Sequence, residues 1–123
     1  MRGEQYLTKP AQYALVYSKG SSLASQWLVM KTIYNSRPLS RYGLSVSKKV
    51  GNAVVRNRVK RRLREILRAT PLKAGHDIVF IVRPATASTD YGNLKKAVEN
   101  LLSRAHLAGM NEGPEIMSQG TQR

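Results

Sequence analysis

The sequence contains no cysteine among its 123 residues. This absence excludes disulfide bonds, thiolate metal ligands and a cysteine nucleophile. No run of 18 apolar residues occurs, and the first residues, Met1 to Tyr6, lack the apolar segment of a secretory signal. We therefore expect a cytoplasmic protein that does not span a membrane.

Acidic residues are also scarce, and the seven present are scattered: Glu4, Glu65, Asp77, Asp90, Glu99, Glu112 and Glu115. Hydrolysis by protein carboxylates would require several of them to converge around a metal ion, and their spacing shows no such cluster. The two histidines, His76 and His106, are far apart and have no serine or carboxylate pattern beside them. The sequence predicts no catalytic residue, no metal site and no cofactor bound by this chain.

Basic residues dominate instead, since 21 lysines and arginines give a net charge of +14. Positive charge at this density opposes compaction unless a polyanion neutralises it. We therefore expect a nucleic acid or an anionic membrane surface as the partner. A chain of this length holds one modest core, so we predict a single domain over residues 1–109. Residues 110–123 show no periodicity and are predicted to form a disordered tail.

The first periodic segment predicts a helix that begins after Thr8 and ends near Gly20. In this helix Tyr13 and Tyr17 are four residues apart and share one face. Residues 21–25 are expected to form a loop that leads into the first strand.

Three segments have strand patterns. Residues 27–34 and 41–46 are expected to form an antiparallel hairpin, with one face of the second strand in solvent. Residues 77–83 contain an uninterrupted apolar run, which predicts a central strand covered on both faces. A final amphipathic helix should begin at Thr89 or Asp90.

The segment between Gly51 and Pro71 predicts a helix with Asn52 as its N-cap. At 100° per residue it has an apolar stripe and, beside it, a purely basic stripe. The apolar stripe consists of Val55, Val59, Leu63, Ile66 and Leu67, and the basic stripe consists of Arg56, Lys60, Arg64 and Arg68. The three like-charge pairs of the basic stripe together cost about 1 kcal/mol, a noticeable part of a small domain's stability.

A run of charge is often only a solvated face, but such runs usually mix lysine with glutamate. From Lys48 to Arg64 eight of seventeen residues are basic, none is acidic, and arginine predominates. Guanidinium groups bind phosphate oxygens in pairs and stack on bases. A membrane-surface helix would need apolar residues free to insert, whereas this apolar stripe is required for the core. The pattern therefore favours nucleic-acid binding.

The two aromatic residues of the first helix favour RNA with unpaired bases over duplex DNA. Stacking a base on such a ring contributes about 1 to 3 kcal/mol without needing base identity. The alternative is that Tyr13 and Tyr17 fill the core with their hydroxyls at its rim, and spacing alone leaves both readings open.

Residues 43–61, GLSVSKKVGNAVVRNRVKR, resemble the signature of the bacterial ribonuclease P protein subunit, and Arg56-Asn57-Arg58 matches its RNR motif. The resemblance extends in element order from about Thr8 to Ala108. It implies an α+β fold, a single-domain α/β sandwich similar to the second domain of ribosomal protein S5. A central mixed sheet would contain the RNR helix in a βαβ crossover.

The resemblance also implies a function. The family protein assists a catalytic RNA that removes the 5′ leader from precursor tRNA, and the active-site Mg²⁺ ions belong to that RNA. The partners would be the ribonuclease P RNA and the single-stranded leader, with no membrane and no DNA. This chain would thus be the accessory subunit of an endoribonuclease without catalytic residues of its own.

Carried over by position, the resemblance implies two sets of site residues. Those facing the RNA subunit would be Lys48, Lys49, Asn52, Arg56, Asn57, Arg58, Lys60, Arg61, Arg62 and Arg64. Those lining the cleft for the leader would be Tyr13, Tyr17 and Lys31. Lys31 stands where some relatives have a third aromatic residue, so a stacking contact would be exchanged for a phosphate contact. A structural ribosomal or RNA-chaperone protein and a stand-alone nuclease are the alternative functions.

Overall fold

The computed structural model describes residues 6–108, which form three α-helices, four strands and two short 3-10 helices. In chain order these are α1 (Pro10–Lys19), β1 (Ser21–Ala24), β2 (Leu28–Tyr34), β3 (Arg41–Ser45), η2 (Lys48–Val50), α2 (Ala53–Ala69), β4 (His76–Val82), η3 (Pro84–Ser88) and α3 (Tyr91–Arg104). The predicted tail over residues 110–123 and its boundary at residue 109 lie outside the described residues.

The strands form one mixed sheet in the order β1-β2-β4-β3. β2 pairs antiparallel with both β1 and β4, whereas β3 pairs parallel with β4. A parallel pair needs a crossover connection, and here α2 supplies it between β3 and β4. The predicted α+β class, with a mixed sheet and a βαβ unit around the basic helix, is confirmed.

The predicted hairpin of the segments at 27–34 and 41–46 is wrong, because β4 lies between β2 and β3. β4 is the strand whose apolar residues continue without alternation, and burial on both faces of the sheet requires the central position. The predicted loop at 21–25 is also wrong, since Ser21–Ala24 forms the edge strand β1 against β2. Two serines and an alanine have little intrinsic strand preference, so this strand depends on its pairing with β2.

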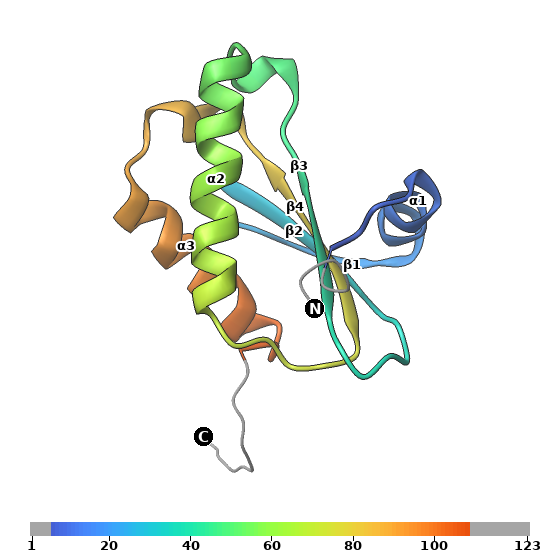
Figure 1. The fold of residues 1–123 in the computed structure, drawn as a ribbon. Helices are drawn as coiled ribbons and strands as arrows, with labels where there is room; N and C mark the ends of the chain where they lie inside the picture. Colours follow the sequence, from blue (N-terminus) through green and yellow to red (C-terminus); the bar gives the residue numbers. More distant parts are fainter. Residues whose placement is uncertain (1–5, 109–123) are drawn as a thin grey trace.

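Helices cover both faces of the sheet, with α2 and α3 on one side and α1 on the other (Figure 1). The larger core lies between the sheet and α2 with α3, and includes the fully buried Phe80, Leu63 and Leu101. A smaller core lies under α1, where Val16 packs with Leu7 and Val79. β4 contributes alternate residues to the two cores, as expected for a central strand.

The helix ends follow from local chemistry. Lys9, rather than the predicted Thr8, precedes the first turn of α1, and the Gln12 side-chain oxygen accepts hydrogen bonds from both backbone N–H groups at 3.0 and 2.8 Å. Asn52 caps α2 by accepting from the Val55 N–H at 3.0 Å, as predicted. Asp90 caps α3 in the same way. Within residues 6–108, no helix combines the length and the apolarity needed to cross a bilayer.

Candidate nucleic-acid interface

The orientation of α2 is set by its apolar stripe. Val59, Leu63, Ile66 and Leu67 are buried against the sheet and α3, and Val55 packs at the margin of this core. The basic residues must therefore lie on the outer and lateral surfaces of the helix. Asn57, Arg61, Arg64 and Arg68 are exposed, whereas Arg56, Arg58, Lys60 and Arg62 are half-buried.

All three half-buried arginines of α2 donate hydrogen bonds to backbone carbonyls of this chain. Arg56 Nε donates to Gly51 O at 3.2 Å. One guanidinium nitrogen of Arg58 donates to Ala87 O at 3.3 Å, and one of Arg62 donates to Thr89 O at 3.4 Å. A guanidinium has five N–H donors, so each of these side chains keeps donors for a phosphate while its position is restrained.

The remaining basic residues of α2 are not engaged in this way. Within residues 6–108, no side-chain hydrogen bond or ion pair involves Asn57, Lys60, Arg61, Arg64 or Arg68. Their charges are therefore balanced only by solvent and ions. Such a surface matches a phosphate backbone, which would release those ions on binding.

The start of the predicted RNA-subunit surface lies just before α2. Lys48 and Lys49 are exposed in η2, which places them next to the N-terminus of the helix. Asn52 belongs to the same stretch, but its side-chain oxygen is already used as the N-cap of α2. Asn52 thus has a structural role as the N-cap, and its side-chain amide nitrogen is the group left to bind a ligand.

On the opposite face of the sheet, the two tyrosines of α1 have different environments. Tyr13 is half-buried, packs beside the smaller core, and its hydroxyl donates to Leu7 O at 3.4 Å. Tyr17 is 41% exposed, and its ring centroid lies 6.5 Å from that of Tyr13. Burial raises the pKa of the Tyr13 hydroxyl, so this group stays protonated as a donor at neutral pH.

Lys31 lies on the same face of the sheet as α1. It is directly opposite Val79 on β4, and Val79 packs against Val16 of α1. Directly opposed residues of an antiparallel pair share a face, so the Lys31 side chain is on the Tyr13 and Tyr17 side of the molecule. The three residues predicted for the leader cleft are therefore on one face.

A hollow of about 420 Å³ lies between this face and α2 at the outer edge of β3, where the Leu7 N–H donates to Tyr42 O at 2.9 Å. Its lining residues are Tyr6, Leu7, Tyr13, Tyr42, Gly43, Leu44, Lys60 and Arg64. Tyr13 from the predicted leader cleft and two basic residues from the predicted RNA-subunit surface thus face the same space. The sequence pattern did not predict this junction, because α1 and α2 are joined only through the tertiary structure.

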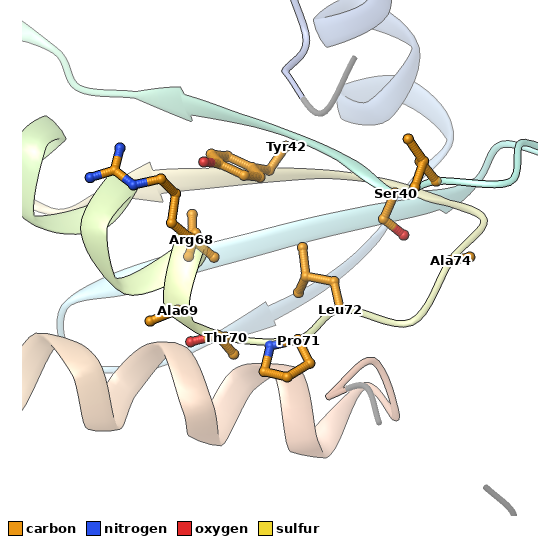
Figure 2. Close-up of a pocket in the computed structure, with 10 residues that line it drawn as sticks. Ser40, Tyr42, Arg68, Ala69, Thr70, Pro71, Leu72 and Ala74 are labelled. Atoms are coloured by element: carbon orange, nitrogen blue, oxygen red, sulfur yellow. The ribbon is translucent and has the colours of Figure 1, made fainter. Parts of the chain in front are cut away.

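A second hollow, of about 360 Å³, adjoins the first through the Tyr42 side chain and lies beneath the end of α2 (Figure 2). Its lining residues are Leu39, Ser40, Tyr42, Leu67, Arg68, Ala69, Thr70, Pro71, Leu72 and Ala74. Arg68 is absent from the predicted site residues, although its place four residues after Arg64 was a signal for it. Periodicity alone could not show that a hollow lies beside it.

This surface can bind a ligand through its cationic side chains and its aromatic rings. Within residues 6–108, no group of three or more histidine, aspartate or glutamate side chains is placed to hold a metal ion. The one ion pair of this region joins Arg41 to Asp77 at 2.7 Å and lies near the start of β3 and β4, away from the arginine surface.

Comparisons with known proteins agree with this geometry. The ribonuclease P family model matches residues 1–106. The chain is 46% identical over 107 residues to the ribonuclease P protein component of Dehalococcoides mccartyi, covering 87% of this chain and 89% of that protein. It is 42% identical over 103 residues to that of Caldanaerobacter subterraneus, covering 82% and 89%.

Solved structures give the same result for the fold. A mutant RNase P protein of Staphylococcus aureus superposes with a TM-score of 0.81 at 33% identity, covering 87% of this chain and 92% of that chain. The RNase P protein of Thermotoga maritima gives a TM-score of 0.75 at 31% identity, covering 88% and 98%. Fold, sequence and the arginine-rich helix thus agree, and the chain belongs to the ribonuclease P protein family.

Proposed function

We propose that this chain assists the catalytic RNA of ribonuclease P in removing the 5′ leader from precursor tRNA. The observation that carries the proposal is the exposed basic surface of α2, which has no acidic residue before Glu65 and whose outward cations have no partner in residues 6–108. Keeping like charges side by side is unfavourable unless phosphates lie against them.

The surface for the RNA subunit consists of η2 and the outer side of α2. Its residues are those predicted above, from Lys48 to Arg64, and Arg58 and Arg62 act with their guanidinium groups restrained by Ala87 O and Thr89 O. Restraint lowers the entropy lost when a phosphate is bound. The Mg²⁺ ions that the reaction needs belong to the RNA in this proposal.

The leader binds on the α1 side of the sheet. Tyr17 offers an exposed ring for stacking on an unpaired base, and Lys31 offers a charge on the same face. Tyr13 is more buried than Tyr17 and lines the hollow beside β3. The two surfaces meet there, so the leader and the RNA subunit bind to adjoining parts of one molecule.

The test is cleavage of a precursor tRNA by a bacterial ribonuclease P RNA at low Mg²⁺, with and without the purified chain. We expect the chain to increase the cleavage rate and to lower the Mg²⁺ concentration required. Mature tRNA, which lacks a leader, should bind the complex more weakly than the precursor.

Two outcomes would contradict the proposal. Tight binding to ribosomal RNA without stimulation of cleavage would indicate a structural or chaperone protein. Cleavage by the chain after all RNA has been removed would indicate a stand-alone nuclease. The variant Lys96→Ala, which removes an exposed charge of α3, provides a matched control that should behave as the parent protein.

A further inference from the structure

The two hollows described above are neighbours, and residues of both α2 and β3 line each of them. Tyr42 lines both of them. The upper hollow is the one of about 420 Å³, lined by Gly43 and Leu44, and the lower hollow is the one of about 360 Å³, lined by Leu39 and Ser40. The term groove denotes these two neighbouring hollows together; they lie beside β3, an edge strand of the sheet at which the Leu7 N–H donates to Tyr42 O at 2.9 Å. Tyr13 lines the groove at the upper hollow, and the C-terminal residues of α2 line it at the lower hollow.

One wall of this groove is the basic stripe of α2. Lys60 and Arg64 line the upper hollow, and Arg68 lines the lower one. Successive members are four residues apart, so each charge is displaced by about 6 Å along the helix axis from the one before it. This displacement is comparable with the spacing of successive phosphates in an extended RNA strand, which makes the stripe a suitable track for one strand.

The lower hollow has the chemistry of a nucleotide site. Its floor contains the apolar side chains of Leu67 and Leu72, and the guanidinium of Arg68 is its charged group. The buried Ser40 hydroxyl already donates to Lys73 O and accepts from the His76 N–H. Figure 2 shows the Arg68 side chain extending from the end of α2 on the same side as the Tyr42 ring. An apolar floor can receive a base while the guanidinium binds its phosphate.

We propose that the lower hollow is an additional binding site for the single-stranded leader, which continues from the Tyr13 side past Lys60 and Arg64 to Arg68. In this extension Lys60 and Arg64 contact the leader together with Arg68, and the other basic residues of η2 and α2 contact the RNA subunit. This inference rests on the proposed function and extends it, because the hollow is lined by the end of α2, and α2 and α1 lie on opposite faces of the sheet (Figure 1). Longer leaders reach the lower hollow and shorter ones end before it.

Charge complementarity is the reason for choosing RNA as the occupant. The groove lining includes three cations and no carboxylate. Arg68 is exposed and its side chain makes no hydrogen bond or ion pair within residues 6–108, so its guanidinium is available. The single acidic residue of α2, Glu65, does not line either hollow.

The experiment measures the affinity of the complete holoenzyme for precursor tRNAs whose leaders are lengthened one nucleotide at a time. For the parent chain, affinity should rise in two stages, the second of which marks arrival at the lower hollow. The variant Arg68→Ala should leave the first stage unchanged and reduce affinity for long leaders by about 3- to 10-fold, with a smaller salt dependence for long leaders only.

A second variant tests the hollow rather than the charge. Ala69→Trp places a large ring at a position that lines the lower hollow and is exposed, so the core is not altered. It should also remove the second stage. Lys96→Ala removes one exposed charge from α3 and should change neither stage.

The failure of this inference is distinguishable from failure of the proposed function. Tyr17→Ala is expected to weaken binding of every precursor with a leader relative to mature tRNA. If Tyr17→Ala does so but Arg68→Ala has no dependence on leader length, the lower hollow is not a leader site. Equal losses for mature tRNA and long-leader precursor in Arg68→Ala would place Arg68 against the RNA subunit or the tRNA body and would overturn the inference. If Tyr17→Ala shows no preference either, the proposed leader cleft itself is wrong.

Discussion

Gly43 determines where Tyr13 can lie. A Cβ added at Gly43 would be 2.4 Å from the Tyr13 hydroxyl oxygen and 2.6 Å from the ring carbon that carries it. Only glycine leaves room for the ring to pass directly over β3. The sequence predicted that this strand has one face in solvent, but Gly43 is buried because Tyr13 covers that face. The absence of a side chain at Gly43 thus allows the Tyr13 ring to line the upper hollow.

Asp77, at the start of the central strand β4, connects neighbouring strands at one end of the sheet. Its carboxylate accepts from Arg41 at 2.9 and 2.7 Å and from the Asn35 side chain at 2.7 Å, which joins β2, β3 and β4. Burial raises the pKa of this carboxyl, but the hydrogen bonds from Arg41 and Asn35, together with the charge of Arg41, outweigh it, so the net pKa is lowered.

Asp77→Asn should lower the free energy of unfolding at pH 7 by about 2 kcal/mol, because it leaves the Arg41 charge poorly compensated. A lowered carboxyl pKa stabilises the fold above the ordinary value of 3.8, and this contribution is lost as the pH falls from there through the folded-state pKa. Urea denaturation at pH 7 and at several points below pH 4 would measure both effects.

As the pH falls below about 4, the Asp77→Asn variant should therefore lose less stability than the parent protein. Glu99→Gln is a suitable control, since Glu99 is exposed and has no ion pair in residues 6–108. If acid lowers the stability of the Asp77→Asn variant and of the parent protein equally, the ion pair between Arg41 and Asp77 does not contribute to the stability of the fold.

At the scale of elements, α2 is joined to η3 by its own arginines. The bonds of Arg58 and Arg62 to Ala87 O and Thr89 O hold the segment before α3 beside the basic surface. These arginines therefore contribute to both the fold and the proposed RNA interface, whereas the exposed Arg61 has only the second role.

This difference predicts distinct outcomes for two variants. Arg61→Ala should weaken binding to the catalytic RNA and reduce the slope of log affinity against log salt by about 1, with stability unchanged within about 0.5 kcal/mol. Arg58→Ala should have a similar effect on binding and should also lower stability by about 1 kcal/mol, because Ala87 O loses its donor. Salt titrations of binding and urea denaturation would measure the two effects.

An unchanged salt slope in Arg61→Ala would refute the interface on α2. Equal stability of the Arg58→Ala and Arg61→Ala variants would show that the bond to Ala87 O contributes nothing to the fold.

For the whole molecule, the net charge of +14 is the dominant electrostatic feature. Local pairing relieves little of the repulsion, since Arg41 with Asp77 is the one ion pair found in residues 6–108. Repulsion among the cations destabilises the compact state, and salt screens that repulsion.

The melting temperature of the free chain should therefore rise between about 10 mM and about 300 mM NaCl at neutral pH. A polyanion that binds the folded state should raise it further at low salt, whereas an uncharged polymer at the same mass concentration should not. Thermal denaturation followed by circular dichroism would test this. A melting temperature independent of ionic strength would show that charge repulsion is not limiting.

The amino-acid sequence by itself determined the features that are local. Uniform charge and a 3.6-residue apolar period placed a basic amphipathic helix at α2, and the Asn52 cap follows from its side-chain chemistry. The apolar run of β4 gave its central place in the sheet. These features depend on neighbours in the chain, so residue types and their spacing were sufficient, and with the resemblance they led to the family.

Only the tertiary structure decided the features that join distant segments. Strand order is one of them, because which strands pair depends on how both faces of β4 are covered and not on the pattern of β2 or β3 alone. The junction of Tyr13 with Lys60 and Arg64 is another, since it requires α1 and α2 to approach opposite sides of one strand edge. The hollow beside Arg68 also depends on the tertiary structure. It lies between elements that are distant in the sequence, so no local pattern of side chains predicts it.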